Sequence, residues 1–166
     1  MAELARTFNN LALAYRRTGH YREAKSSQRQ GVDILEKLTK QHPDDVDFRL
    51  ALAIAYRGFY PFASRGSDRR ERDQVRTAGI DILERLVDEF PKVPDYQFEL
   101  CETLITNFSS RESLGDRRGQ IKRGLALAST LMQEHPGVPR SRVLMADALR
   151  ELARAQTSEL AEQWYV

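Results

Sequence analysis

The sequence has few of the residues on which disulfide-bonded and membrane-spanning proteins depend. Its 166 residues include one cysteine, Cys101, so no internal disulfide can form, and this favours a reducing compartment such as the cytoplasm. No apolar run approaches the roughly 20 residues of a membrane-spanning helix, and the first ten residues lack the parts of a signal peptide. We therefore expect a cytoplasmic protein with no membrane partner.

Motifs for catalysis and for cofactor binding are also missing. There is no glycine-rich phosphate loop, no zinc-ligand spacing and no nucleophile elbow. His42 and His135 each precede a proline at a position that Phe90 occupies elsewhere, which indicates packing rather than ligation. Cys101 aligns with alanines, as a small buried thiol would. The sequence predicts no enzyme, no metal and no cofactor.

Charge of one sign is not in excess. The 26 basic and 24 acidic side chains leave a net charge of +2, too small to indicate a nucleic-acid partner by itself. Two local basic clusters carry acidic residues among them, so we interpret them as solvated helix starts, with a ridge that binds nucleic acid as the alternative. The clusters are Arg65, Arg69, Arg70, Arg72 and Arg76, and Arg111, Arg117, Arg118, Lys122 and Arg123.

An internal repeat is present. Three apolar-striped segments each begin with a glycine and reach a proline 12 residues later, and successive copies are 48 and then 45 residues apart. Each proline ends a helix, because it cannot continue the hydrogen-bonding pattern and pushes the residue before it toward extended geometry. The segments run from Gly31 to Pro43, from Gly79 to Pro91 and from Gly124 to Pro136.

A second segment recurs between these copies. It places large residues at positions i and i+4 with small residues between them, so the large residues share a helix face and the small ones let another helix approach. The repeating unit is therefore a pair of helices, and stacked pairs bury the apolar stripes that one pair leaves open. The copies are Leu11-Ala12-x-Ala14-Tyr15, Leu52-Ala53-x-Ala55-Tyr56, Leu100-Cys101-x-Thr103-Leu104 and Met145-Ala146-x-Ala148-Leu149.

These patterns predict an all-α fold, an α-α superhelix of about three helix pairs plus a C-terminal helix, in one domain over residues 1–166. Repeat 1 covers about 3–43, repeat 2 about 44–91, repeat 3 about 92–136, and the terminal helix region 137–166. Gly19, Gly66 and Gly115 are expected in the turns within pairs. The expected helices cover about 3–17, 21–41, 45–59, 69–89, 94–108 and 116–134, and a last helix starts near 139 and either runs on or breaks toward 163.

The first repeat resembles the tetratricopeptide repeat. The stretch Phe8-Asn9-Asn10-Leu11-Ala12-x-x-Tyr15, followed by Gly19-x-Tyr21-x-x-Ala24, is similar to the pattern of that family. The repeats are longer than the usual 34 residues, as in kinesin light chains. The stretch LVDEFPKVPDY resembles repeats of planctomycete proteins related to serine/threonine kinases. The later repeats depart from the pattern, with Arg49 and Gln97 at the opening aromatic position.

The resemblance implies a bacterial scaffold that binds a peptide or a partner protein in the groove lined by the first helix of each pair, as a regulatory segment of a larger kinase-related protein. In that groove, asparagine amides would hold a peptide backbone, and Arg16, Arg17 and Arg57 would hold the carboxylates of an acidic partner. The positions implied are Arg6, Asn9, Asn10, Leu13, Arg16, Arg17, Leu50, Ile54, Arg57, Phe98, Glu99, Glu102, Asp147, Arg150 and Glu151.

Two other functions stay open at this point. The basic clusters would bind nucleic acid if they lay along one edge of a solenoid, although the low net charge makes nucleic acid the weaker alternative. The chain ends in Trp164, Tyr165 and Val166, and a terminal repeat without a cap exposes apolar surface. A homo-oligomer through the terminal repeats is the third possibility.

Overall fold

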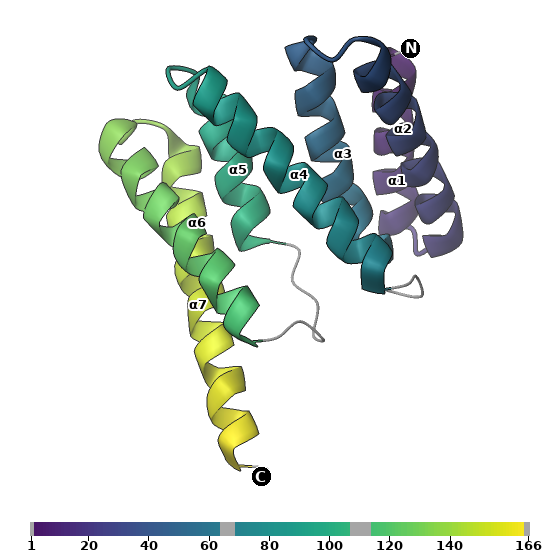
Figure 1. The fold of residues 1–166 in the computed structure, drawn as a ribbon. Helices are drawn as coiled ribbons and strands as arrows, with labels where there is room; N and C mark the ends of the chain where they lie inside the picture. The colour runs from purple at the N-terminus through teal and green to yellow at the C-terminus, as the bar shows by residue number, and fades with distance from the viewer. Residues whose placement is uncertain (1, 64–68, 107–113, 165–166) are drawn as a thin grey trace. The chain divides into compact units, whose positions relative to one another are not determined.

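The structure is a computed structural model that describes residues 2–63, 69–106 and 114–164. These residues form seven α-helices, and they include no β-strand, which confirms the all-α class (Figure 1). The helices are α1 (Ala2–Arg17), α2 (Tyr21–Gln41), α3 (Val46–Ala63), α4 (Arg69–Glu89), α5 (Pro94–Ile105), α6 (Leu114–Glu134) and α7 (Pro139–Trp164).

Local sequence signals account for most helix ends. Asp45 caps α3, because its Oδ1 accepts a hydrogen bond of 3.0 Å from the backbone N–H of Phe48. Pro94 opens α5, where a missing backbone N–H costs nothing. Gly19 has a φ of +81°, a conformation that glycine adopts without strain and that lets the chain reverse between α1 and α2.

Three helix ends differ from the expectation. Helix α5 ends at Ile105, with Thr106 in an extended conformation, and does not reach residue 108. The helix expected to end near residue 59 continues through Pro61 to Ala63, because a proline in the last turn removes only one hydrogen bond. Helix α6 begins at Leu114, so Gly115 lies in its first turn and not in the turn before it. Gly66 and residues 107–108 lie outside the described residues.

Helices α1 to α4 form one compact unit, residues 1–89. Each helix packs against the next in the chain. Helix α1 also contacts α3, so the first helices of the two pairs both lie against α2 (Figure 1). Their core is continuous and apolar, with Phe59 fully buried. The core residues are Ala5, Val32, Leu35, Leu52, Ala55, Phe59 and Val75.

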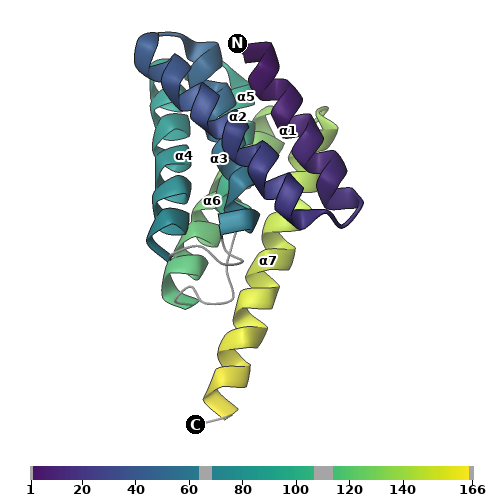
Figure 2. The same cartoon turned by 90° about the vertical axis from the view of Figure 1, so that its right-hand side faces the viewer.

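Helices α5 to α7 form the second unit, residues 90–166. Helix α6 packs against both neighbours, α5 contacts α7, and the C-terminal part of α7 continues beyond α6 (Figure 2). The core residues are Phe98, Cys101, Ile105, Ala128, Leu131, Leu144 and Ala148. Within each unit the contacts are those of stacked helix pairs, and a superhelix through the whole chain stays a prediction.

The repeated glycines mark the points where the two helices of a pair approach most closely. A Cβ atom at Gly31 of α2 would lie 2.9 Å from Oδ1 of Asn9 on α1. At Gly124 of α6, a Cβ atom would collide with the side chain of Ile105 on α5. The glycine period of the sequence is therefore the period of the helix–helix contact.

The residue before each repeat proline packs its ring against another ring. This confirms the packing interpretation of the two histidines that precede prolines, because phenylalanine makes the same kind of contact in the second repeat. The ring pairs are His42–Phe48, Phe90–Tyr96 and His135–Phe98, with centroid distances of 5.8, 5.9 and 6.1 Å.

Candidate peptide-binding groove

A groove of about 600 Å³ runs between α1 and α3 in the first unit. The α1–α3 groove is lined by both helices, with one residue of α2 at its base. Six of the positions implied by the repeat pattern lie together in it, which places them on one surface. These six are Arg6, Asn9, Asn10, Leu13, Leu50 and Ile54, and the other lining residues are Glu3, Ala5, Leu35, Asp45, Asp47, Phe48 and Ala51.

Helical spacing explains why these side chains meet. Asn9 and Asn10 lie three and four residues after Arg6, and Leu13 lies four and three residues after them, so all four share one face of α1. The contact between α1 and α3 brings the matching face of α3 opposite them. The base of the groove is closed by buried apolar residues, while Leu13 and Ile54 are 48% and 36% exposed. An apolar side chain of a partner could therefore contact the walls.

A buried glutamine that the sequence reasoning missed holds the groove together. Gln28 of α2 is 4% exposed, and its Nε2 donates to Oδ1 of Asn9 at 3.0 Å and to the backbone oxygen of Ala55 at 3.1 Å. One side chain thus joins α1, α2 and α3. The side-chain oxygen of Asn9 is engaged within the fold, so Asn10, which is exposed, is the better candidate for contacts to a peptide.

The charges in the α1–α3 groove are mostly negative. Its lining includes the carboxylates of Glu3, Asp45 and Asp47 and a single cation, Arg6. The guanidinium of Arg6 lies 3.5 Å from the carboxylate of Glu3, and both side chains are largely exposed. The arginines expected to hold an acidic partner do not line the groove. Arg16 and Arg17 are exposed at the end of α1, and Arg57 is half-buried on α3.

In the second unit, Phe98 does not face a groove as expected. It is 4% exposed and belongs to the apolar core with residues of α6 and α7. The guanidinium of Arg140 lies 5.4 Å from the centre of its ring, and His135 packs beside it. The expectation was wrong because an aromatic side chain at this point of α5 is covered by α7, a helix that begins only at Pro139.

The carboxylates of Glu99 and Glu102 are joined to α7. Arg140 donates to Glu99 at 2.6 Å and to Glu102 at 2.8 Å, so a single guanidinium links α5 to the start of α7. Burial by itself would lower the pKa of Arg140, but the hydrogen bonds to these carboxylates raise it above its ordinary value. These residues hold two helices together, and no local sequence pattern reveals a pairing across about 40 residues.

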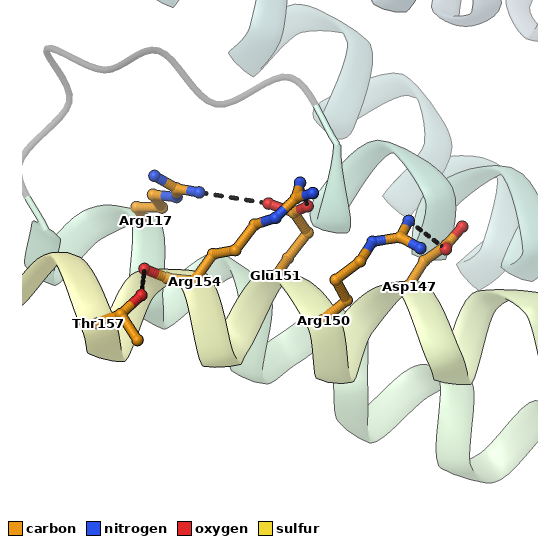
Figure 3. Close-up of polar contacts among 6 residues, drawn as sticks. All are labelled: Arg117, Asp147, Arg150, Glu151, Arg154 and Thr157. Carbon is orange, nitrogen blue, oxygen red and sulfur yellow. Dashed lines mark hydrogen bonds and ion pairs between the residues drawn. The ribbon is translucent and has the colours of Figure 1, made fainter.

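A smaller cavity of about 380 Å³ lies beside α7, and Figure 3 shows its charged residues. Arg150 contacts Asp147 at 2.5 Å, and Arg154 contacts Glu151 at 2.7 Å. Arg117 of α6 reaches the same Glu151 at 3.3 Å. Asp147, Arg150 and Glu151 were expected in the groove, and they lie here among neutralising partners. The cavity is also lined by Ile105 and Thr106.

Cys101 has the properties of a packing residue. Its side chain is fully buried, and its thiol donates to the backbone oxygen of Gly124 at 3.3 Å. Burial and the nearby carboxylate of Glu102 raise the pKa of Cys101 to about 12, so the thiol is protonated at neutral pH. A protonated thiol is a poor nucleophile.

Metal sites and membrane-spanning helices can be assessed in the part of the chain that the structure describes. No three histidine, cysteine, aspartate or glutamate side chains gather there as metal ligands would. None of the helices, over their described residues, has the length and apolar character needed to cross a membrane. Several residues of the basic clusters and of the terminal aromatic segment lie outside the described side chains. These are Arg65, Arg69, Arg70, Arg72, Arg111, Trp164, Tyr165 and Val166.

The fold and the groove define a class of protein, an all-α protein of packed helix pairs. The sequence matches no protein-family model, and no curated protein is significantly similar to it. The similarity to tetratricopeptide repeats therefore depends on the residues of this chain alone, and membership of that family stays a proposal.

Proposed function

We propose that this chain is a protein-interaction scaffold, not an enzyme, and that it binds a peptide segment of a partner protein in the α1–α3 groove. One observation carries the proposal: six positions chosen from the repeat pattern line a single groove of about 600 Å³. A preformed groove with apolar walls and a few polar groups is the usual form of a binding site.

The proposal includes the architecture that the repeats imply. Helix pairs that each leave an apolar stripe uncovered are stabilised by stacking, and a superhelix through both units would present the first helices of successive pairs along one face. In this arrangement the chain acts as an interaction segment of a kinase-related cytoplasmic protein. The repeated close contacts at Gly31 and Gly124 support the repetition on which the superhelix depends.

The chemistry of the groove favours a particular peptide. An aliphatic side chain of the peptide packs against Leu13, Leu50 and Ile54, which removes apolar area from water. A lysine or arginine beside it lies near the carboxylates of Asp45 and Asp47. Since these groups make the groove negative, we propose a basic peptide in place of the acidic one expected from the sequence.

A selection from a random peptide library displayed on phage, with the whole chain as bait, tests the site. Selected peptides are expected to bind the unmodified chain and to lose at least about tenfold in affinity on Leu13→Asp. Leu11→Asp is the matched control, because Leu11 lies on the same helix, is 39% exposed and does not line the groove. Equal binding to the two variants would place the site elsewhere.

A second comparison tests the charge of the peptide. Asp47→Lys is expected to weaken binding of the selected basic peptides, whereas Asp81→Lys, at an exposed position of α4 away from the groove, leaves it unchanged. Selection of acidic peptides by the unmodified chain would contradict the proposal that the bound peptide is basic. The site itself would still stand if Leu13→Asp abolished that binding.

A further inference from the structure

Helix α7 carries a row of apolar side chains that no described residue covers. Val143 and Leu149 are 56% and 51% exposed, and Ala146 and Ala153 are exposed between and beyond them. Steps of three, three and four residues place all four on one face of the helix. We call these four residues the open face of α7. It lies in the second unit and is separate from the α1–α3 groove.

The repeat shows what covers this face in the other helix pairs. Ala146 aligns with Cys101 of α5, and Leu149 aligns with Leu104. Cys101 is 0% exposed and Leu104 is 2% exposed, against 51% for Leu149. The same comparison holds in α3, where Ala53, the counterpart of Ala146, is 0% exposed. The helix face that is buried on α3 and α5 is therefore exposed on α7.

In both of those pairs the cover is the next helix in the chain. The thiol of Cys101 donates to the backbone oxygen of Gly124 on α6, 3.3 Å away. A Cβ atom at Gly79 of α4 would lie 3.6 Å from the backbone oxygen of Ala53. A helix thus packs on each of these faces with a glycine at the closest point. By this comparison, the shape of the open face suits an amphipathic helix with a small residue opposite Ala146.

Charge decides which helix fits. Helical spacing places Arg142, Arg150 and Arg154 on or beside the open face, and the last two are 57% and 63% exposed. Figure 3 shows Arg150 and Arg154 with the carboxylates of Asp147 and Glu151 that they contact. Asp147 pairs with Arg150 and Glu151 pairs with Arg154, so three arginines against two carboxylates leave this part of α7 with a small positive charge. A second copy of α7 would bring arginines toward arginines, which costs free energy. A helix with acidic residues beside its apolar stripe would not.

We propose that the open face of α7 binds an acidic amphipathic helix of a partner protein, which packs on α7 as α6 packs on α5. The apolar stripe of the partner covers Val143, Ala146 and Leu149, and its carboxylates lie beside the arginines. Recognition of an amphipathic helix by an apolar face with flanking charges is a common mode of protein interaction.

The helix α6 itself supplies a probe. A synthetic peptide of residues 114–134 carries the stripe that covers α5, and the substitutions Arg118→Glu, Lys122→Glu and Arg123→Glu make it acidic without touching the buried positions Ile121, Gly124 and Ala128. Fluorescence anisotropy with the whole chain is expected to show binding of the acidic peptide at least about tenfold tighter than binding of the unsubstituted peptide. Failure of both peptides to bind, or equal binding of both, overturns the proposal.

Variants of the chain locate the site. Leu149→Glu places a carboxylate in the open face and is expected to abolish binding of the acidic peptide. Val138→Glu is the matched control, because Val138 is 37% exposed and precedes α7. Circular dichroism melting checks that both variants fold. If Leu149→Glu does not fold, Leu149→Ala replaces it and is expected to weaken binding, because it removes apolar area from the open face without adding a charge. Binding of the acidic peptide to Leu149→Glu with unchanged affinity overturns the proposal. A concentration-dependent dimer that Leu149→Glu dissociates also overturns it, because a second copy of the chain would then occupy the open face.

Discussion

At the scale of single residues, two glycines on α6 meet opposite surroundings. A Cβ atom added at Gly124 would collide with Ile105, whereas one added at Gly119 has nothing within 4 Å. Glycine in a helix interior costs roughly 0.5–1 kcal/mol relative to alanine. We therefore expect Gly119→Ala to stabilise the protein by up to that amount, and Gly124→Ala to destabilise it by about 1–3 kcal/mol through overpacking.

Urea unfolding of both variants measures this difference, since the two substitutions are identical and on one helix. Similar changes in the free energy of unfolding would show that α5 and α6 do not approach closely at Gly124. A glycine in that position would then have to be explained by something other than the space between the helices.

At the scale of helices, Arg140 joins the start of α7 to α5 through Glu99 and Glu102. Arg140→Ala leaves two carboxylates without this cation, one of them on a side chain only 13% exposed. Removing a partner from a buried ion pair costs about 3–5 kcal/mol, and exposed pairs contribute roughly 0.2–1 kcal/mol. Because the side chain of Arg140 is itself 36% exposed, we expect a loss of about 1–2 kcal/mol after discounting for solvent.

Arg140→Lys is expected to recover only part of that stability, because an ammonium does not stack over the ring of Phe98 as the planar guanidinium does, 5.4 Å from the ring centre. Arg142→Ala, two residues further on at an exposed position, serves as the control and should stay within about 0.5 kcal/mol of the unmodified protein. Chemical unfolding gives all three values. An effect of Arg140→Ala no larger than that of the control would contradict the link between the helices.

A second link between helices depends on pH. Arg49 near the start of α3 donates two hydrogen bonds, of 2.6 and 2.7 Å, to Glu89 at the end of α4. These hydrogen bonds lower the pKa of Glu89 below its ordinary value. A group with a lowered folded-state pKa stabilises the protein above its unfolded-state pKa, about 4.3 for glutamate, and this contribution is lost as the pH falls through the folded-state pKa.

The stability difference between the unmodified chain and Glu89→Gln is therefore expected to be largest near pH 7 and to shrink as the pH falls below about 4. Glu89 is partly exposed, so the difference is small and should decrease further in high salt. Urea midpoints at several pH values measure it. A difference that stays constant from neutral to acid pH would contradict the role of the Arg49–Glu89 pair.

The helices could be predicted from the sequence because their signals are local and repeated. Pro43, Pro91 and Pro136 predict the ends of α2, α4 and α6 within a few residues. The continuation of α3 through Pro61 could not be predicted, since a single lost hydrogen bond in a last turn is outweighed by packing elsewhere. Helix propensity is a property of the residue itself and can be read from the sequence. Packing depends on neighbours that are distant in the sequence, so its effect on a helix end cannot be predicted in this way.

The candidate groove was predictable to the extent that it depends on helix periodicity. Leu13 and Ile54 share the faces that the repeat pattern assigned to them. Phe98 and Glu102 obey the same periodicity, but α7 covers the first and pairs with the second, and the sequence pattern does not show where α7 packs. Gln28 was missed for a similar reason, because its partners are 19 and 27 residues away.

At the scale of the whole molecule, the proposed superhelix makes a prediction about how instability spreads. In a solenoid each repeat is stabilised by its neighbours, so destabilising one repeat weakens the next repeat most and distant ones least. Gly124→Ala acts within the second unit. We expect it to raise the hydrogen-exchange rate of backbone amides in α5 and α6 strongly, in α3 and α4 less, and in α1 and α2 least.

Hydrogen exchange followed by mass spectrometry, with peptides assigned to each helix, measures this gradient in the whole chain. Gly119→Ala again serves as the control and should raise exchange nowhere. Unchanged exchange in residues 1–89 on Gly124→Ala would mean that the two units unfold independently. The chain would then be two separate helical units and not one superhelix, and the α1–α3 groove would have to bind its peptide without the first helices of the second unit.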